Sequence, residues 1–519
     1  MHARFSPRSI LLLILSTLLS FATVGAAPAT PERLAKNPEL EQLAGCRHRL
    51  GQADRSGEGQ AGQTEWRARF YEISGSLDFD AERFHGRVLA YLTPESAVEH
   101  LVLDAFDTLS EISVRVDGEE AVWSRLSPTT IDIETPLATV DLESVIQVDY
   151  VASPNLVDFG AFWFPVYSDD EGNEFKMCQT MTETQNAGTW WPCIDRLSHK
   201  PDSVALAITV PDTMMVASNG LLDELAEPGD GGDGTRTYRW RERHPIATYL
   251  VSMTVAPYHS PGGDGLPWIE SYDLGEGQSL PLHHYVRPHH FAKAQQNLPW
   301  IVDMLDAFRA RFGEYPFADE KYGVAEFSFL GGMEHQTISN ISPITVAGED
   351  SISFVQSHEL AHQWFGDKVS PASWEDIWLN EGFATYGEAI YFEHFGRWTA
   401  GRYMFQRRRL AGDTLFEGSV YAPNSTFGTT TYWKGGWVLH MLRDLLGDEL
   451  FYETLEYWAQ FPHEGGVATT AEFQAAAELV SGRDLDGFFQ RWVYGTGRPI
   501  YSVDWTSAGA AASWELNVT

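Results

Sequence analysis

The sequence predicts an α+β fold divided into several domains, because three kinds of residue pattern follow one another along the chain. Short alternating runs bounded by turn residues extend over 66–258, which is an all-β pattern. Segments with apolar residues at helical spacing follow over 259–497. Residues 498–519 return to strand character and stop in mid-strand. At 519 residues the chain is too long for one ordinary domain, so two or three domains are expected.

The first residues have the layout of a secretory signal. Two arginines precede an apolar run that starts at Ile10, and small residues follow at 25–27. We therefore expect a signal peptide over 1–27 and a secreted or periplasmic protein. The alternative is an uncleaved anchor, which the shortness of the apolar run disfavours. No later stretch is apolar enough to span a membrane, so no stable membrane insertion is expected after cleavage.

A lead-in and a β region follow the signal. Residues 28–65 are rich in Pro, Gly, Gln and charge, which predicts a flexible segment. From Trp66 onward, runs such as FHGRVLAYLTP and SVIQVDYVA alternate apolar and polar residues as half-buried strands do. The Gly/Asp cluster in EPGDGGDGTRTYRW predicts the tip of a hairpin. A calcium site there is a weaker alternative, because the Asp spacing fits no known metal loop.

Four segments of the second half are expected to be helical, and the strings AEFQAAAELVSG and DLDGFFQRWVYGTG follow them. The first runs through HHFAKAQQNLPWIVDMLDAFRARFG and ends at Gly313. The others are 353–366, 374–396 and 433–446.

Charge and cysteine content limit the partners and the redox chemistry. The net charge of −36, from 72 acidic against 36 basic residues, would repel nucleic acid and anionic lipid. Solubility is the simpler explanation for this charge, and attraction of cationic substrates is the other. The three cysteines have no zinc-thiolate spacing. Cys178 and Cys193 are expected either to form a disulfide or to remain buried thiols.

The string SHELAHQWFG, residues 357–366, places two histidines four apart with a glutamate beside the first. On a helix, His358 and His362 share one face and can converge on a single cation. Zinc suits neutral imidazole ligands, and Glu359 is placed to take a proton from a bound water. Because such a string also arises by chance on surface helices, the rest of the chain must supply a third ligand.

Glu381 is the candidate for that third ligand, with eighteen residues between it and His362. Two helices joined by a short loop would bring its carboxylate to the imidazoles and leave a fourth position for water, as a catalytic zinc site requires. Taken alone, Glu381 would be a solvated helix glutamate. Glu388 lies two turns further along the same face, where it either orients a histidine or forms a surface salt bridge.

With these residues the sequence resembles the gluzincin aminopeptidases related to aminopeptidase N and leukotriene hydrolase. The resemblance covers the chain from about residue 66 to the end. It implies a β-saddle domain over 66–258, a thermolysin-like zinc domain over 259–497 and the beginning of a β-sandwich over 498–519. The strings that carry it are GGMEH (331–335), HELAHQWFGD (358–367), WLNEGFA (378–384), YWKGG (432–436) and, upstream, TETQNAGTWWPCID.

The resemblance also implies an enzyme that releases residues from peptide N-termini. One zinc ion per chain would be held by His358, His362 and Glu381. Glu359 would act as general base and then pass the proton to the leaving amine. Tyr432 would donate a hydrogen bond to the oxyanion of the tetrahedral intermediate.

The substrates implied are peptides with a free N-terminus. Glu334 would bind the α-ammonium group together with Glu183, which lies nine residues before the proline of PCID. Two carboxylates near one cation would reject peptides whose amine is blocked or internal. The backbone of Gly331 and Gly332, with the adjoining Met333, would hold the peptide.

Two positions depart from the family pattern. His335 stands where an asparagine is usual, and Met181 stands where some members carry a polar residue lining the first side-chain pocket. A packing role for His335 is the simpler expectation. Because of Met181, side-chain preference cannot be carried over from the family.

Two rival functions remain open. The first is epoxide hydrolysis, which a branch of the family performs with the same zinc. The second is a non-catalytic binding scaffold, for which loss of a zinc ligand or of the base would be expected. This sequence retains both histidines, both glutamates and the tyrosine, which favours the enzyme.

Overall fold

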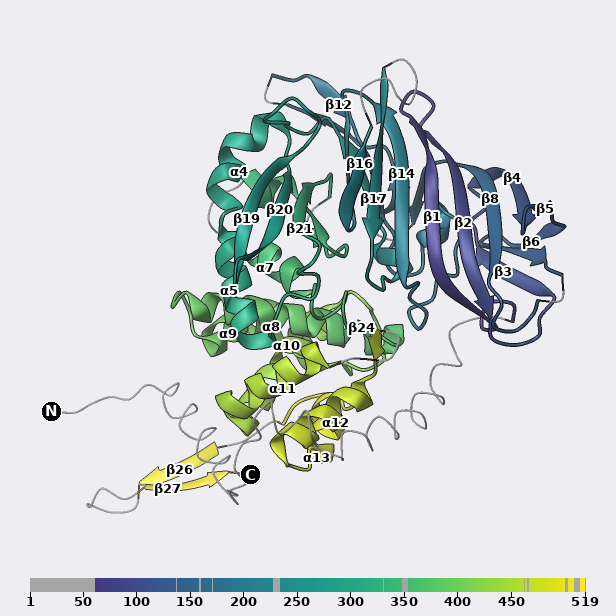
Figure 1. Ribbon diagram of the computed structural model, residues 1–519. Helices are drawn as coiled ribbons and strands as arrows, with labels where there is room; N and C mark the ends of the chain where they lie inside the picture. The colour runs from purple at the N-terminus through teal and green to yellow at the C-terminus, as the bar shows by residue number, and fades with distance from the viewer. Residues whose placement is uncertain are drawn as a thin grey trace.

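The computed structural model describes residues 61–499 except 137, 158–159, 170, 227–233, 330, 348–352, 462 and 464–465, and also two strands at 503–507 and 514–518. The described part has a strand-rich N-terminal half and a helical C-terminal half that lie against each other (Figure 1). The expected signal peptide, Cys46, most of the lead-in and the tip of the Gly/Asp-rich hairpin lie outside the described residues.

An eight-stranded sheet organises the N-terminal half. β1 (Trp66–Asp78) runs antiparallel to β2 (Arg83–Pro94) and parallel to β14 (Ser203–Pro211). Buried side chains recur at every second residue of β2, because one face of the sheet covers a core. The order is β16–β17–β14–β1–β2–β8–β4–β5, with β16 (Leu221–Leu225), β17 (Thr235–Glu242), β8 (Ser144–Ala152), β4 (Leu109–Val116) and β5 (Glu119–Glu120).

Three smaller sheets complete this half. Buried side chains from the five-stranded and the three-stranded sheet among them join those of the eight-stranded sheet in one apolar cluster. Cys178 and Cys193 lie in this cluster as separate buried thiols, so the disulfide alternative is wrong. The sheets are β15–β18–β13–β10–β9, β3–β7–β6 and β11–β12, formed by β3 (His100–Asp104), β6 (Trp123–Ser127), β7 (Thr130–Glu134), β9 (Asn155–Val157), β10 (Gly160–Trp163), β11 (Val166–Ser168), β12 (Glu174–Lys176), β13 (Cys178–Met181), β15 (Met215–Ser218) and β18 (Met253–Ala256).

The packed region begins before Trp66. Gln63 is buried, and its side-chain amide donates a hydrogen bond of 2.7 Å to Asp104. The amide of Val102 donates to the carbonyl of Gly62 at 2.8 Å. Residues 61–65 are therefore part of the domain rather than of a flexible lead-in.

The C-terminal half combines one mixed sheet with helices around a second apolar cluster. The sheet has the order β19–β20–β21–β23–β22, with β19 (Trp268–Gly275), β20 (Gln278–Tyr285), β21 (Tyr322–Glu326), β23 (Ile338–Ile341) and β22 (Gly332–Met333). The longer helices are α5 (Trp300–Phe312), α7 (Ser353–Ala361), α8 (Trp378–His394), α9 (Ala400–Ala411), α10 (Gly435–Leu446), α11 (Asp448–Gln460) and α12 (Thr470–Ser481), and the shorter ones are α4 (Phe291–Asn297), α6 (Pro343–Ala347) and α13 (Asp486–Trp492).

The predicted helical segments are present with different boundaries. The segment that ends at Gly313 is divided into α4 and α5 by Leu298 and Pro299, because proline has no amide hydrogen to continue a helical ladder. α7 ends at Ala361 instead of extending to residue 366. The segment 433–446 begins with a π-helical turn, η7 (Thr430–Lys434), before α10.

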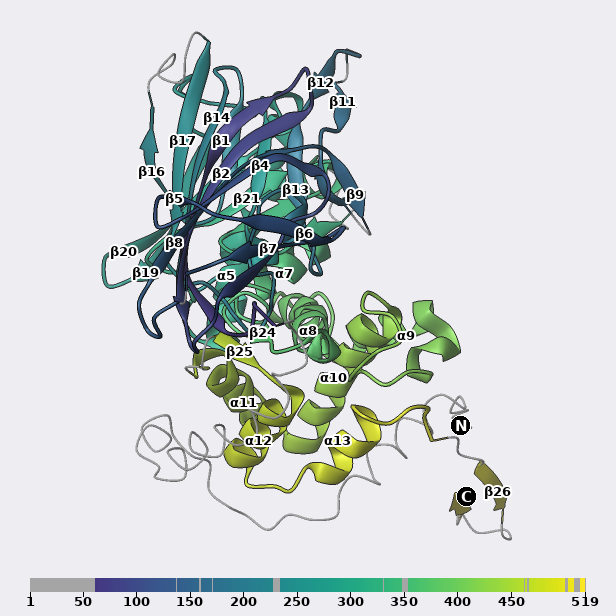
Figure 2. The same ribbon diagram turned by 90° about the vertical axis from the view of Figure 1, so that its right-hand side faces the viewer.

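Buried polar contacts join the two halves, which Figure 2 shows stacked one above the other. The ammonium of Lys200 donates to the carbonyl of Asp367 at 2.5 Å. The side-chain amide of Asn219 donates to the carbonyl of Gln336 at 2.7 Å. Because Gln336 directly follows the string GGMEH and Asp367 ends HELAHQWFGD, these contacts fix the motif segments relative to the N-terminal half.

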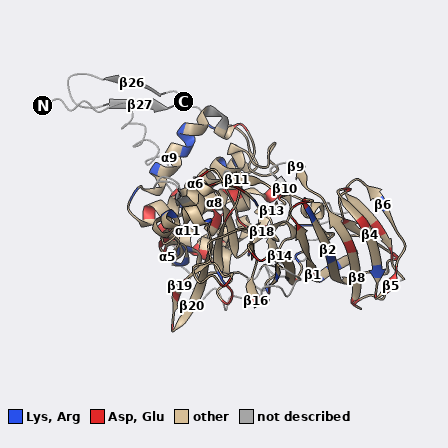
Figure 3. Cartoon of the chain, turned by 90° about the horizontal axis from the view of Figure 1, so that it is seen from above, with Lys and Arg blue, Asp and Glu red and all other residues tan. Residues whose placement is uncertain are grey.

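Two further features concern the surface and the end of the chain. Acidic segments occur over both halves rather than in one block (Figure 3). Among the described residues, no helix has the length and apolarity needed to cross a membrane. The strands β26 (Val503–Ser507) and β27 (Trp514–Val518) pair antiparallel and are drawn apart from both halves (Figure 1). A β-sandwich starting here remains a prediction.

Candidate metal centre

The three predicted ligands come together in the interior of the C-terminal half. Their ligand atoms all lie within 4.8 Å of one another, and all three residues are buried. The Nε2 atom of His358 is 3.1 Å from Oε2 of Glu381, and the Nε2 atom of His362 is 3.5 Å from the same oxygen. The three side chains therefore converge on one point, as a single bound cation requires.

The backbone explains how two consecutive helices achieve this convergence. His362 follows the last residue of α7, but its amide still donates to the carbonyl of His358 at 3.2 Å, so the two imidazoles keep helical spacing. α8 packs closely on α7 because Gly387 has no side chain. A Cβ atom at Gly387 would lie 2.7 Å from the Cβ of Ala361, a distance that real Cβ contacts do not reach. This close packing places Glu381 beside the histidines.

Each histidine is also fixed on its outer side. Nδ1 of His358 is 2.8 Å from the carboxylate of Glu388, and Nδ1 of His362 is 3.0 Å from the carbonyl of Phe365. Because both partners are acceptors, each Nδ1 carries the proton and each Nε2 keeps its lone pair for a metal. Two imidazole nitrogens and a carboxylate oxygen are the donor set of catalytic zinc, so these residues fit that ion. Glu388 is buried, and its alternative assignment to a surface salt bridge is wrong.

Glu359 lies beside this centre. One carboxylate oxygen of Glu359 lies within 4.8 Å of a ligand atom of His362 and of Glu334. Burial raises the pKa of Glu359 to about 8, against the lowering effect of the two histidines. A dication at the ligand cluster would stabilise the ionised form, which is the form a general base needs.

Gly332 makes room for Glu359. A Cβ atom at this position would lie 2.4 Å from both Cγ and Oε1 of Glu359. Gly331, in contrast, has a φ of +113° and open space where a Cβ would be. Gly332 is thus needed for the close approach of Glu359, and Gly331 is needed for its own backbone conformation.

Glu334 and Glu183 form the second half of the site. Glu334 is buried, and the hydroxyl of Tyr249 donates to its Oε1 at 3.4 Å. Oε1 of Glu183 is buried without a hydrogen-bond partner in the structure. Burial raises the pKa of both carboxyls, and for Glu183 the charges of Glu334, Glu381 and Glu359 raise it further. Such a concentration of carboxylates can bind more positive charge than one metal ion supplies.

Gln363, which the motif analysis passed over, connects the metal ligands to Glu334. Its Nε2 donates to the carbonyl of Glu334 at 3.2 Å, and its Oε1 accepts from the amide of Thr337 at 2.8 Å. The residue adjoins His362 and is completely buried. The available sequence signal was a glutamine next to a predicted ligand, but a sequence does not reveal which polar residues are buried.

The ring of Tyr432 lies over one of the predicted metal ligands, His358. The two rings are stacked, with their centroids 5.8 Å apart and an angle of 17° between their planes. It belongs to the π-helical turn η7, a wider turn that often occurs at functional sites. Burial, with the charges of Glu381 and Glu183, raises the pKa of Tyr432 well above its usual range. The hydroxyl is therefore protonated and able to donate a hydrogen bond at neutral pH.

The remaining predicted positions are mainly packed. His335 is completely buried and its Nδ1 is 3.2 Å from the side-chain oxygen of Asn340. Burial lowers the pKa of His335 to about 4, so this residue is a neutral packing partner. Met181 and Met333 are buried in the apolar cluster of the N-terminal half. Met333 thus packs in this core and exposes little surface for contact with a peptide.

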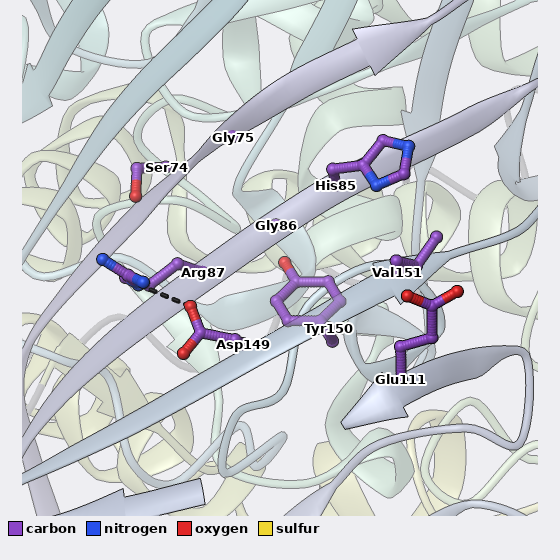
Figure 4. Close-up of a pocket in the computed structure, with 9 residues that line it drawn as sticks. All are labelled: Ser74, Gly75, His85, Gly86, Arg87, Glu111, Asp149, Tyr150 and Val151. Carbon is purple, nitrogen blue, oxygen red and sulfur yellow. Dashed lines mark hydrogen bonds and ion pairs between the residues drawn. The ribbon is translucent and has the colours of Figure 1, made fainter. Parts of the chain in front are cut away.

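A separate hollow lies on the eight-stranded sheet. It has a volume of about 390 Å³ and an ion pair of 2.5 Å between Arg87 and Asp149 at its edge (Figure 4). Its lining comes from β1, β2, β4 and β8 and includes His85, Glu111 and Tyr150. None of the predicted site residues lines this hollow.

Comparison with known families matches both halves of the chain. The model described as "Peptidase M1 N-terminal domain" matches residues 68–250, and the model described as "Peptidase family M1 domain" matches residues 299–492. These matches cover the eight-stranded sheet and the metal centre respectively.

Curated relatives are mostly aminopeptidases. "Probable aminopeptidase 2" of Sulfurisphaera tokodaii is 25% identical over 461 residues, which is 83% of this chain and 54% of that protein. "Aminopeptidase N" of Streptomyces lividans is 30% identical over 321 residues, 55% of this chain and 34% of the relative. "Leukotriene A-4 hydrolase" of Xenopus laevis is 25% identical over 400 residues, 70% of this chain and 60% of the relative. The chain thus spans about half the length of the first relatives it matches.

A solved structure has a similar fold and a similar length. A point mutant of the M1 zinc metallopeptidase from Deinococcus radiodurans superposes with a TM-score of 0.72 at 22% identity, covering 85% of this chain and 96% of that one. With family models matched in both halves and the ligand geometry described above, the chain belongs to peptidase family M1, the aminopeptidase N group of gluzincins.

Proposed function

We propose that this chain is a zinc-dependent aminopeptidase that hydrolyses the N-terminal peptide bond of peptides. The observation that carries the proposal is the joining of two clusters. His358, His362 and Glu381 form a catalytic zinc donor set, and the carboxylates of Glu334 and Glu359 lie within reach of the same His362. A metal site alone would suit many hydrolases, whereas the adjoining surplus of carboxylates suits a substrate with a free ammonium group.

The residues divide the chemistry among themselves. What zinc supplies, when held by the three ligands, is Lewis acidity toward the scissile carbonyl and toward water. Glu359 takes a proton from the attacking water and delivers it to the leaving amine. The hydroxyl of Tyr432 donates a hydrogen bond to the carbonyl oxygen as negative charge develops on it.

The carboxylates of Glu334 and Glu183 determine where the peptide is cut. Binding of the α-ammonium between them places the first peptide bond, and no later one, at the zinc ligands. The same binding brings a cation to two buried carboxyl groups whose pKa values burial raises.

Removal of the metal is expected to abolish activity. Incubation with a zinc chelator should reduce hydrolysis of a panel of amino-acyl fluorogenic amides to background, because both Lewis acidity and water activation are lost. Addition of zinc should restore it, as fluorescence progress curves would record. Hydrolysis that is unaffected by the chelator, with no zinc found in the purified protein, would contradict the proposal.

The same panel separates the enzymatic rivals. Faster turnover of a lipid epoxide than of any amino-acyl amide would favour epoxide hydrolysis. The two carboxylates at the ammonium position favour the peptide substrate, because an epoxide carries no cation for them to bind.

We also propose that the protein is secreted or periplasmic, on the basis of the basic, apolar and small-residue order of residues 1–27. Expressed in its host, the chain should be found outside the cytoplasm with a mass lower than that of the full sequence. Mass spectrometry of the recovered protein measures this, and an intact N-terminus in the cytoplasmic fraction would contradict it.

A further inference from the structure

A third group of residues contacts His358 through Nδ1, the ring nitrogen that faces away from the ligand cluster. Glu388, whose Oε1 is 2.8 Å from Nδ1 of His358, uses its second oxygen to contact helix α9. That oxygen, Oε2, accepts hydrogen bonds from the hydroxyl of Tyr403 and from Nη2 of Arg407, the latter at 2.5 Å. One carboxylate thus connects a metal ligand on α7 to two side chains on α9 (Figure 3 marks the basic residues of this helix).

The arginine is well enclosed. The side chain of Arg407 is 15% exposed and that of Glu388 is 5% exposed. The guanidinium lies over the rings of Phe354, at 4.7 Å, and Trp433, at 5.7 Å. Its Nε also donates to the hydroxyl of Tyr403 at 3.0 Å. An ion pair shielded from water in this way has well-defined geometry, unlike an exposed one.

These contacts reach three elements that carry His358, Glu381 and Tyr432. Phe354 lies on α7, which carries His358. Glu388 lies on α8, which carries Glu381. Trp433 adjoins Tyr432 in η7. A single guanidinium group therefore lies against α7, α8 and η7 at once.

We propose that Arg407, assisted by Tyr403, is a positioning residue of the zinc site. It holds Glu388 with one oxygen directed at His358, and this contact fixes the ring orientation and the Nε2 lone pair that zinc needs. Without Arg407, the buried carboxylate of Glu388 would lose its counter-charge and a hydrogen bond, and its contact with His358 would loosen. The inference rests on the zinc site of the proposed function and extends it by two residues that touch neither metal nor substrate.

The competing explanation is that Arg407 only stabilises the packing of α9. The two explanations differ in what they predict for the zinc dissociation constant. A packing role lowers the unfolding temperature of the metal-free protein and leaves zinc affinity unchanged. A positioning role weakens zinc binding even under conditions in which the metal-free protein is fully folded.

The test is therefore a zinc titration of metal-free protein against a chelator of known affinity. Arg407→Gln is expected to weaken zinc binding by about 10- to 100-fold, the effect usual for residues that support a ligand from outside the coordination sphere. Arg407→Lys should recover part of the affinity, because it keeps the charge but not the forked geometry. Arg402→Gln is the matched control, since Arg402 is an exposed arginine of the same helix and should leave the affinity unchanged.

A second variant covers the case in which Arg407→Gln fails to fold. Tyr403→Phe keeps the ring and removes only the hydroxyl that donates to Glu388, so a smaller loss of zinc affinity in the same direction is expected. Unchanged zinc affinity in a folded variant of either residue, with or without a lower unfolding temperature, would overturn the inference. A different result would separate this inference from the proposed function. If zinc affinity falls from the wild type to Arg407→Lys to Arg407→Gln but the protein hydrolyses no amide, the proposed function is refuted and this inference stands.

Discussion

Replacing Glu359 by glutamine is expected to abolish peptide hydrolysis while the protein still binds one zinc ion per chain. Glutamine has the same shape but cannot accept the proton of the attacking water. The expected fall in kcat is about 10²- to 10⁴-fold, the usual contribution of a general base. Because Glu359 is not among the three ligands, metal analysis of the purified variant should find zinc at the wild-type level.

The measurement is the initial rate on the best amino-acyl amide, with zinc content and unfolding temperature determined on the same preparation. Gly332→Ala offers an independent check, because its Cβ would occupy the space 2.4 Å from the Glu359 carboxylate. This variant should lose activity by displacing Glu359 while leaving its chemistry intact. Full activity of Glu359→Gln at normal zinc content would exclude Glu359 as the base.

The sequence predicts the pairing of the two histidines well because these ligands obey a local rule: one helical turn holds His358 and His362 on the same face. The expected short loop to the helix of Glu381 is wrong, because residues 362–377 separate α7 from α8. The packing of α8 on α7 brings Glu381 to the histidines, whereas spacing alone predicts the histidine pair. The same holds for the general division into a strand-rich half and a helical half, which follows from the period of the apolar residues.

Other features depend on contacts between distant segments, which no local pattern encodes. The parallel pairing of β1 with β14 joins residues more than a hundred positions apart. Arg407 reaches Glu388 from a helix whose sequence has no recognisable motif, so only the fold reveals that contact. The burial of Gln363 is likewise a property of the packed protein.

Local signals also leave element boundaries unsettled. α7 ends at Ala361, although the apolar pattern continues to Phe365. The backbone after Ala361 leads into the segment whose Asp367 carbonyl accepts a hydrogen bond from Lys200 of the N-terminal half, a tertiary contact that local propensity does not encode. His362 keeps its place because its amide still donates to the carbonyl of His358, four residues earlier.

Acetylation of the substrate's N-terminus is expected to stop cleavage almost completely. Glu334 and Glu183 are buried, and burial raises the pKa of each carboxyl group. The ionised form of each is therefore unfavourable until a cation approaches. An acetylated amine brings no charge and leaves the pair uncompensated. The expected loss in kcat/KM is about 10²- to 10³-fold, as when one partner of a buried charge pair is removed. Paired assays of one peptide in free and acetylated form measure it.

Glu334→Gln identifies the residue responsible. The variant should lose about 10- to 100-fold in kcat/KM on the free peptide, the value of a charged hydrogen bond, and little on the acetylated one. The ratio between the two substrates should therefore shrink while zinc content stays constant. This ratio, and not the metal, tests for an exopeptidase, since the same three ligands would serve an endopeptidase equally well. If internal fragments are released rapidly from the acetylated peptide, the zinc site would remain valid, but the assignment of the two carboxylates to the substrate's ammonium group would be refuted.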